Sequence, residues 1–80
     1  MKLIDCAPGR RCQVDSLDLP LELSRRLEAL GLIAGSTVAV LRKKGSRRLG
    51  AMIITVRGTR FAVSMKIAAN ITVRGEENAS

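Results

Sequence analysis

A row of leucines that ends at a glycine narrows the possible folds of this chain more than any other pattern. Leu23, Leu27 and Leu30 recur at spacings of four and three residues, which places their side chains on one face of a helix. Gly31 follows the last of them, and glycine adopts the left-handed conformation that ends many helices without steric cost. The pattern predicts an α-helix over about residues 20–30.

The residues after this glycine predict a turn into a sheet. Leu32 and Ile33 provide apolar side chains that can hold the end of the helix against the structure it covers. Gly35-Ser36 is typical of a turn, and residues 37–41 are rich in β-branched side chains. We therefore expect the helix to cover a sheet formed mainly by the second half of the chain.

One strand is expected before the helix. Residues 11–17 alternate between polar and apolar side chains, so Cys12, Val14 and Ser16 should face inward. The helix follows, and the carboxylate of Asp18 is the best candidate to cap its first turn.

Four further strands are expected after the helix, over residues 36–42, 49–57, 60–64 and 71–73. A tight turn at Gly58-Thr59 should join the second and third of these, and a short helical turn at about 65–69 should precede the last. The side chains expected to face inward on the middle strands are Met52, Ile54, Val56, Phe61 and Val63.

Five short strands and one helix fit a mainly β fold, a small and partly open barrel. Eighty residues allow one domain, which we expect over residues 1–75, followed by a disordered tail at 76–80.

Positive charge is concentrated in the second half of the chain. The net charge is +7, and no Asp or Glu occurs between Leu30 and Gly75. Five cations fall within seven residues at the predicted end of a hairpin, with no acid near them in the sequence: Arg42, Lys43, Lys44, Arg47 and Arg48. This basic cluster is either a solvated hairpin end or a docking site for an acidic protein surface or anionic lipid headgroups.

Catalysis and metal binding have little support in the sequence. The chain has no histidine to act as an acid–base group near neutral pH, and it has no phosphate-binding loop. Cys6 and Cys12 lack a histidine to complete a tetrahedral metal site, so we interpret them as small apolar fillers in a reduced, cytosolic protein. We expect no enzyme activity, metal site, cofactor or small-molecule substrate.

Several short pieces, at consistent spacings, resemble one known family. They are Leu3–Gly9, Arg26-Leu27, Leu30-Gly31-Leu32, Gly35-Ser36, Val56-Arg57-Gly58, and Ala68, Ile71 and Val73 in an A-x-x-I-x-V pattern. In these pieces the chain resembles the ferrous iron transport protein A (FeoA) family. The resemblance implies an SH3-like barrel, which is also seen in the C-terminal domain of iron-dependent repressors.

The resemblance also implies a function. It suggests a non-enzymatic cytoplasmic accessory protein that docks on the cytosolic part of the membrane ferrous iron transporter FeoB, and so lies at the inner membrane through its partner. The family's association with transition metal ions does not require this chain to contact iron. Many family members have a proline-containing connection where this chain has the proline-free residues 43–50, so contacts made there do not transfer directly.

Two surfaces are candidates for binding the partner. One is the basic cluster, and the other is the apolar pair Leu32 and Ile33. The alternative function is that of a small basic barrel that binds nucleic acid through its phosphates. Because Phe61 is the only aromatic residue and should face inward, the base stacking that many such barrels use is disfavoured. The sequence leaves open whether the chain forms a homo-oligomer.

Overall fold

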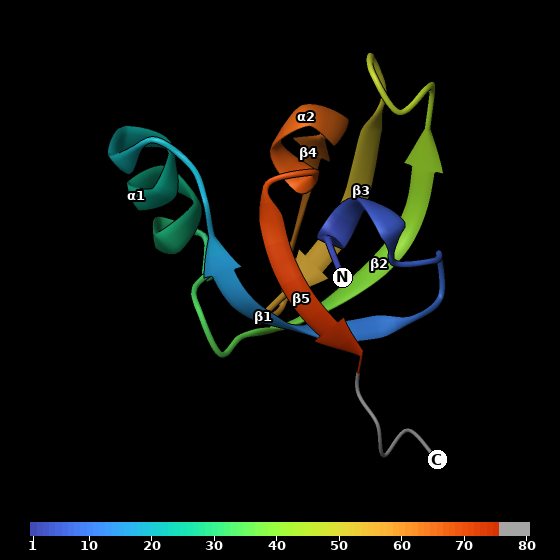
Figure 1. The fold of residues 1–80 in the computed structure, drawn as a ribbon. Helices are drawn as coiled ribbons and strands as arrows, with labels where there is room; N and C mark the ends of the chain where they lie inside the picture. Colours follow the sequence, from blue (N-terminus) through green and yellow to red (C-terminus); the bar gives the residue numbers. More distant parts are fainter. Residues whose placement is uncertain (76–80) are drawn as a thin grey trace.

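The computed structural model of the chain describes residues 1–75. Five strands and two helices follow the expected order (Figure 1). The elements are the 3₁₀ helix η1 (Leu3–Asp5), β1 (Arg11–Leu17), α1 (Leu21–Ala29), β2 (Thr37–Lys44), β3 (Ala51–Val56), β4 (Thr59–Ser64), α2 (Met65–Ala68) and β5 (Ile71–Gly75). The tail predicted at residues 76–80 lies outside the described residues.

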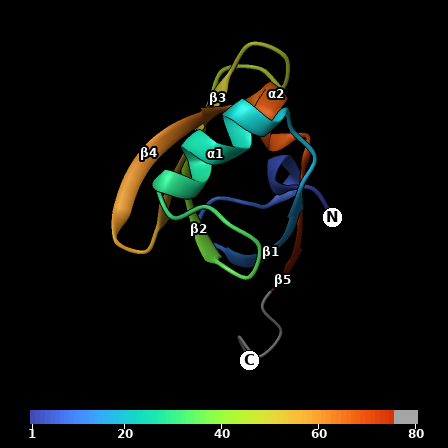
Figure 2. The same ribbon diagram turned by 90° about the vertical axis from the view of Figure 1, so that its left-hand side faces the viewer.

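The five strands form one antiparallel sheet in the order β4-β3-β2-β1-β5. The sheet curls around its apolar face, and α1 and α2 lie on the side where β4 and β5 approach each other (Figures 1 and 2). Every strand contributes to a single core of buried side chains, with Cys12, Val38, Ile54, Val63 and Ile71 as examples. The prediction of a mainly β fold with five strands, one longer helix and one short helical turn is confirmed.

The predicted alternation on the middle strands is confirmed. Met52, Ile54 and Val56 of β3 are buried, as is Val63 of β4. Phe61 is partly buried and packs against the same core. The alternation of side chains between the two faces of a strand was therefore sufficient to identify this part of the core.

The hairpin turn between β3 and β4 lies one residue earlier than predicted. Val56 pairs with Thr59, so the two turn residues are Arg57 and Gly58 rather than Gly58 and Thr59. Both turn residues have positive φ, 52° and 83°, as a type I′ turn requires. This turn matches the twist of the two strands, which outweighs the cost of placing an arginine in the left-handed region.

The inward prediction for Ser16 is wrong. Cys12 and Val14 are buried, but Ser16 is exposed. A shift in the pairing of β1 with β5 between Val14 and Ser16 is the cause, because a β-bulge inserts one residue and reverses the faces beyond it. The alternation of polar and apolar residues alone does not reveal such a bulge.

Helix α1 contacts the barrel mainly through Leu27. Leu27 is buried and Leu23 is half-buried, but Leu30 is 40% exposed, so the prediction that Leu30 faces the barrel is wrong. Leu30 is the residue at which the helix ends, and Leu32, just beyond the glycine, fills the interior in its place. The helix therefore lies at the side of the barrel and does not cover a whole face of the sheet (Figure 1).

The predicted cap at Asp18 is also wrong. The residue at the cap position is Pro20, and no side chain there accepts a hydrogen bond from the first turn of the helix. The backbone N–H of Asp18 instead donates to the carbonyl oxygen of Asn70 at 2.8 Å. This bond holds Asp18, which lies two residues before the cap, against Asn70, the residue that precedes β5.

The glycine stop is confirmed, with φ of +97° at Gly31. The N–H of Gly31 donates to the carbonyl of Glu28 at 2.9 Å, and the N–H of Leu32 donates to the carbonyl of Leu27 at 2.9 Å. These are the two hydrogen bonds of a Schellman motif, in which an apolar contact usually joins the same residues as the longer bond. Leu27 and Leu32 are both members of the buried core.

Ser36 organises the turn that leads from this cap into β2. Its Oγ donates to the carbonyl of Gly31 at 2.8 Å and accepts from the N–H of Ile33 at 3.1 Å. The N–H of Gly35 donates to the carbonyl of Val14 at 2.8 Å, which ties the turn to β1. Only 9% of Ser36 is exposed, so its two hydrogen bonds satisfy polar groups in a largely buried turn.

The N-terminal segment covers the outer edge of β5. Lys2 forms a bridge with Thr72, and Leu3 of η1 is completely buried. Cys6 and Cys12 are also buried, and both have free thiols. The prediction that the cysteines fill apolar space agrees with this burial.

Candidate partner-binding surfaces

The end of the β2–β3 hairpin, where sequence analysis placed the basic cluster, is an ordered turn. β2 extends to Lys44, two residues beyond its predicted end, and the turn begins at Gly45. The hydroxyl of Ser46 accepts from the N–H of Leu49 at 3.0 Å, and the N–H of Gly50 donates to the carbonyl of Ser46 at 2.7 Å. A Cβ at Gly50 would collide with the carbonyl oxygens of Lys44 and Ser46, so the closed turn requires glycine there.

The side chain of Lys43 points toward η1 at the end of the barrel. Its Nζ donates to the carbonyl oxygen of Ile4 at 2.8 Å. Lys43 pairs with Met52, one of the inward residues of β3, after a register shift between Val40 and Arg42. The bulge at Leu41 therefore places Lys43 on the inner face, where it helps to hold η1.

Arg47 has an acidic partner that the sequence did not indicate. Its Nη1 and Nη2 each lie 3.2 Å from Oδ1 of Asp5. The two residues are 42 positions apart, so the acid that is missing near the cluster in the sequence is supplied by the fold. Because both side chains are largely exposed, the pair contributes at most about 1 kcal/mol to stability. The carboxylate nevertheless occupies one edge of the guanidinium.

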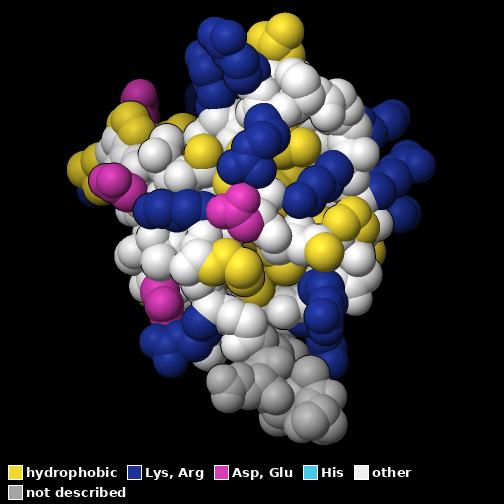
Figure 3. Space-filling view, turned by 45° about the vertical axis from the view of Figure 1, so that its right-hand side comes forward, with side chains coloured by type: hydrophobic (Ala, Val, Ile, Leu, Met, Phe, Trp, Pro, Cys, Tyr) yellow, Lys and Arg dark blue, Asp and Glu magenta, His cyan; other side chains and the backbone are white. Residues whose placement is uncertain are grey.

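Two cations remain free at the hairpin end, beside an exposed leucine. The side chains of Lys44 and Arg48 have no hydrogen-bond or ion-pair partner within residues 1–75. Leu49 is 91% exposed. We call these three residues the apical patch; Figure 3 shows apolar and basic side chains together at the top of the molecule, where the hairpin ends in Figure 1. The patch therefore combines positive charge with an apolar side chain whose exposure to water is unfavourable.

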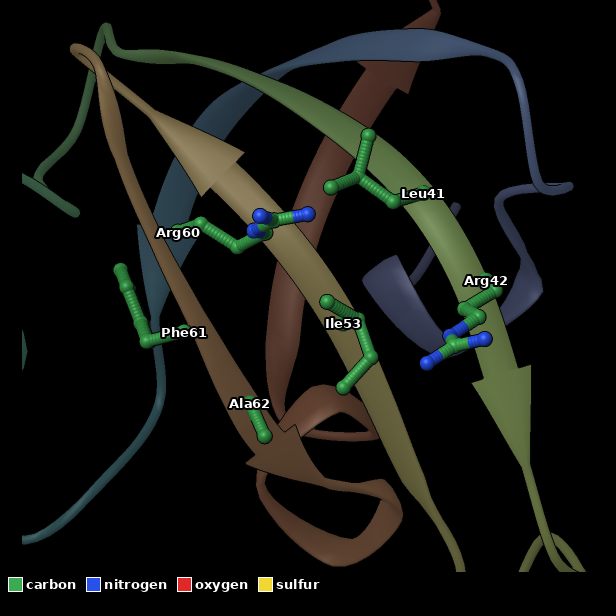
Figure 4. Close-up of a pocket in the computed structure, with 6 residues that line it drawn as sticks. All are labelled: Leu41, Arg42, Ile53, Arg60, Phe61 and Ala62. Atoms are coloured by element: carbon green, nitrogen blue, oxygen red, sulfur yellow. The ribbon is translucent and has the colours of Figure 1, made fainter.

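Arg42 belongs to a different surface, a shallow groove on the outer face of the sheet. We call it the outer groove; the residues that line it come from β2, β3 and β4 (Figure 4) and are Leu41, Arg42, Ile53, Arg60, Phe61 and Ala62. The side chain of Phe61 points away from the groove, toward the other side of β4 (Figure 4). The fold therefore divides the five predicted cations among three locations.

The second predicted partner site, Leu32 and Ile33, is mostly closed. Leu32 is 0% exposed, so its side chain offers no surface to a partner. Ile33 is half-buried, and its backbone N–H is bonded to Ser36. Of this pair only Ile33 has an accessible side chain.

Sequence reasoning missed Leu49 and the outer groove. The exposure of Leu49 could have been predicted, because an apolar residue that follows two arginines and precedes a glycine has no sequence neighbours that favour its burial. The groove had no local signal, because it combines residues from three strands. Within residues 1–75, no three or more His, Cys, Asp or Glu side chains are grouped so that they could hold a metal ion.

Comparison with known families agrees with this fold. The model of the FeoA domain family matches residues 1–75. The chain belongs to the FeoA family. None of the curated proteins matches the sequence. This family is associated with ferrous iron transport, and its fold is SH3-like, as the resemblance implied.

Solved structures give the same result. The FeoA protein of Chlorobium tepidum is 30% identical, with a TM-score of 0.85 over 94% of this chain and 70% of that one. An iron uptake regulatory protein (FeoA) is also 30% identical, with a TM-score of 0.80 over 95% and 97% of the two chains. The FeoA of Stenotrophomonas maltophilia, in complex with zinc, is 28% identical, with a TM-score of 0.73 over 91% and 88%.

The last of these proteins is described as a prokaryotic SH3 domain protein and a candidate ferrous iron transport activating factor. In the part of this chain that the structure describes, no helix has the length and apolar character to cross a membrane.

Proposed function

We propose that this FeoA protein is a non-enzymatic, cytoplasmic accessory protein of bacterial ferrous iron uptake. It docks on the cytosolic part of the transporter FeoB and modulates its transport or nucleotide cycle. Membership of the family supports the iron transport role, and the activating role suggested for the Stenotrophomonas relative supports modulation.

The apical patch is the observation that carries the docking proposal. The side chains of Lys44 and Arg48 have no polar partner among residues 1–75, and Leu49 projects almost fully into solvent beside them. Free cations around an exposed apolar side chain suit an acidic protein surface with a small apolar recess. The ordered turn beneath the patch reduces the entropy lost on binding.

The roles of the two side-chain types in binding differ. The cations accelerate association, and this effect weakens with salt because exposed charges are screened beyond about 8 Å at physiological ionic strength. Leu49 buries apolar surface only after contact, so it mainly slows dissociation.

Binding kinetics to the purified cytosolic domain of FeoB from the same organism test the proposal. We expect Lys44→Glu with Arg48→Glu to slow association by about tenfold or more at low salt. Leu49→Ser should accelerate dissociation and leave association nearly unchanged. Lys43 and Arg47 are poor choices for this test because they hold Ile4 and Asp5.

Arg25→Glu with Arg26→Glu on α1 is the matched control, because it makes the same change in net charge at exposed positions away from the patch. Equal slowing by both double variants would reduce the effect to overall charge and remove the apical patch from the interface. GTP hydrolysis by the FeoB domain, measured with and without this chain, reports modulation directly. Salt-sensitive binding to random duplex DNA without binding to the FeoB domain would overturn docking in favour of the nucleic-acid function.

A further inference from the structure

The outer groove has an apolar floor built across three strands. Ile53 of β3 lies between its pairing partners, Arg42 of β2 and Ala62 of β4. The bulge in β2 adds Leu41 beside this row, and Leu41 is 42% exposed. The floor therefore presents aliphatic side chains that are neither fully buried nor part of the core.

Two arginines border this floor from opposite sides. Arg60 reaches from β4 across β3, and Arg42 reaches from β2 toward the same space (Figure 4). Neither guanidinium has a hydrogen-bond or ion-pair partner within residues 1–75. Two acids of the same range, Asp5 and Asp15, are paired elsewhere, with Arg47 and Arg74.

We propose that the outer groove binds an extended segment of a partner protein in which one apolar side chain lies between two acidic side chains on the same face. Arg42 pairs with Ile53 and Arg60 pairs with Thr55, so the two arginines lie two strands apart, about 10 Å, and two residues apart along the strands, about 7 Å. An extended segment covers the resulting diagonal of about 12 Å in about four residues. Because side chains of an extended segment alternate, the first, third and fifth residues of an acidic–polar–apolar–polar–acidic segment face the groove together. Each carboxylate can then meet one guanidinium in charge-assisted hydrogen bonds, and the central apolar side chain covers Leu41 and Ile53.

The shape of the groove favours a protein segment over a lipid surface. A bilayer meets the parts of a protein that protrude, and the groove floor is recessed between the two arginine side chains. Phosphates of a nucleic acid would use the arginines but would leave the aliphatic floor uncovered. The inference rests on the proposed function only where the segment is assigned to the transporter. Binding of a peptide in the groove can be measured without the transporter.

The probe is the peptide acetyl-Gly-Glu-Ser-Leu-Ser-Glu-Gly-amide, titrated into the ¹⁵N-labelled full chain and followed by NMR. We expect the largest shifts at backbone amides of residues 41–42, 53 and 60–62. Replacing both Glu residues of the peptide by Gln, or its Leu by Ser, should each weaken binding by about tenfold.

Arg60→Gln should weaken the probe's binding by about tenfold, while Arg48→Gln, the same charge change at the apical patch, should leave it within about twofold. Leu41→Ser serves as a second groove variant, and the NMR spectrum of each variant reports whether it is folded. Shifts confined to residues 44–49, or equal binding of the Glu and Gln peptides, would overturn the proposal. So would groove shifts with phosphatidylglycerol vesicles and none with the peptide. None of these results would alter the test of the apical patch against FeoB.

Discussion

The turn after α1 makes Ser36 the most informative single position for stability. Ser36→Ala removes one hydroxyl and with it two hydrogen bonds, of 2.8 Å to the carbonyl of Gly31 and 3.1 Å from the N–H of Ile33. Each such bond contributes about 0.5–1.5 kcal/mol net, so we expect the free energy of unfolding to fall by about 1–3 kcal/mol. Chains of this length have total stabilities of only about 4–12 kcal/mol.

Urea unfolding followed by circular dichroism measures this change. The midpoint should fall while the slope of free energy against urea stays the same, because the surface exposed on unfolding hardly changes. In thermal unfolding, a loss of this size lowers the midpoint by about 5–20 °C in so small a domain.

Ser16→Ala is the matched control for this substitution. Ser16 is an exposed serine on β1, and its removal should change stability by less than about 0.5 kcal/mol. If Ser36→Ala were no more destabilising than Ser16→Ala, the hydroxyl would not be organising the turn, and the argument from its hydrogen bonds would fail.

Two further predictions concern the core. Leu27→Ala should destabilise the protein by about 2–5 kcal/mol, because it removes the buried side chain that joins α1 to the barrel. Leu30→Ala, at a 40% exposed position, should cost less than about 1 kcal/mol. Similar denaturation midpoints for the two variants would contradict this prediction. Because Cys6 and Cys12 are buried, both should react with a thiol reagent slowly in the native protein and rapidly in denaturant. Tight stoichiometric binding of ferrous iron that is lost on Cys6→Ser or Cys12→Ser would contradict the interpretation of the cysteines as apolar fillers.

Features decided by near neighbours in the chain could be predicted from the sequence. Gly31 ends α1 because the left-handed conformation costs glycine little, and no distant residue is needed for that preference. Met52, Ile54 and Val56 share a buried face because an uninterrupted strand alternates its side chains. The family resemblance rested on the same short-range patterns.

Features decided by the pairing of distant segments could not be predicted in this way. A bulge in β1 turned Ser16 outward, and another in β2 turned Lys43 inward, because strand register depends on the partner strand as well as on the chain itself. The turn at Arg57-Gly58 is different, because the preference of type I′ turns for glycine at the second position is a local rule that could have placed it correctly.

The basic cluster illustrates the same limit at the candidate site. As a sequence, its five cations form one unbroken patch of charge. In the fold, Lys43 is bonded to Ile4, Arg47 is paired with Asp5, and Arg42 faces the outer groove. The sequence alone determined how much positive charge this region carries. Only the tertiary structure decided which cations remain free, because their partners lie about forty residues away and meet them only when the barrel closes.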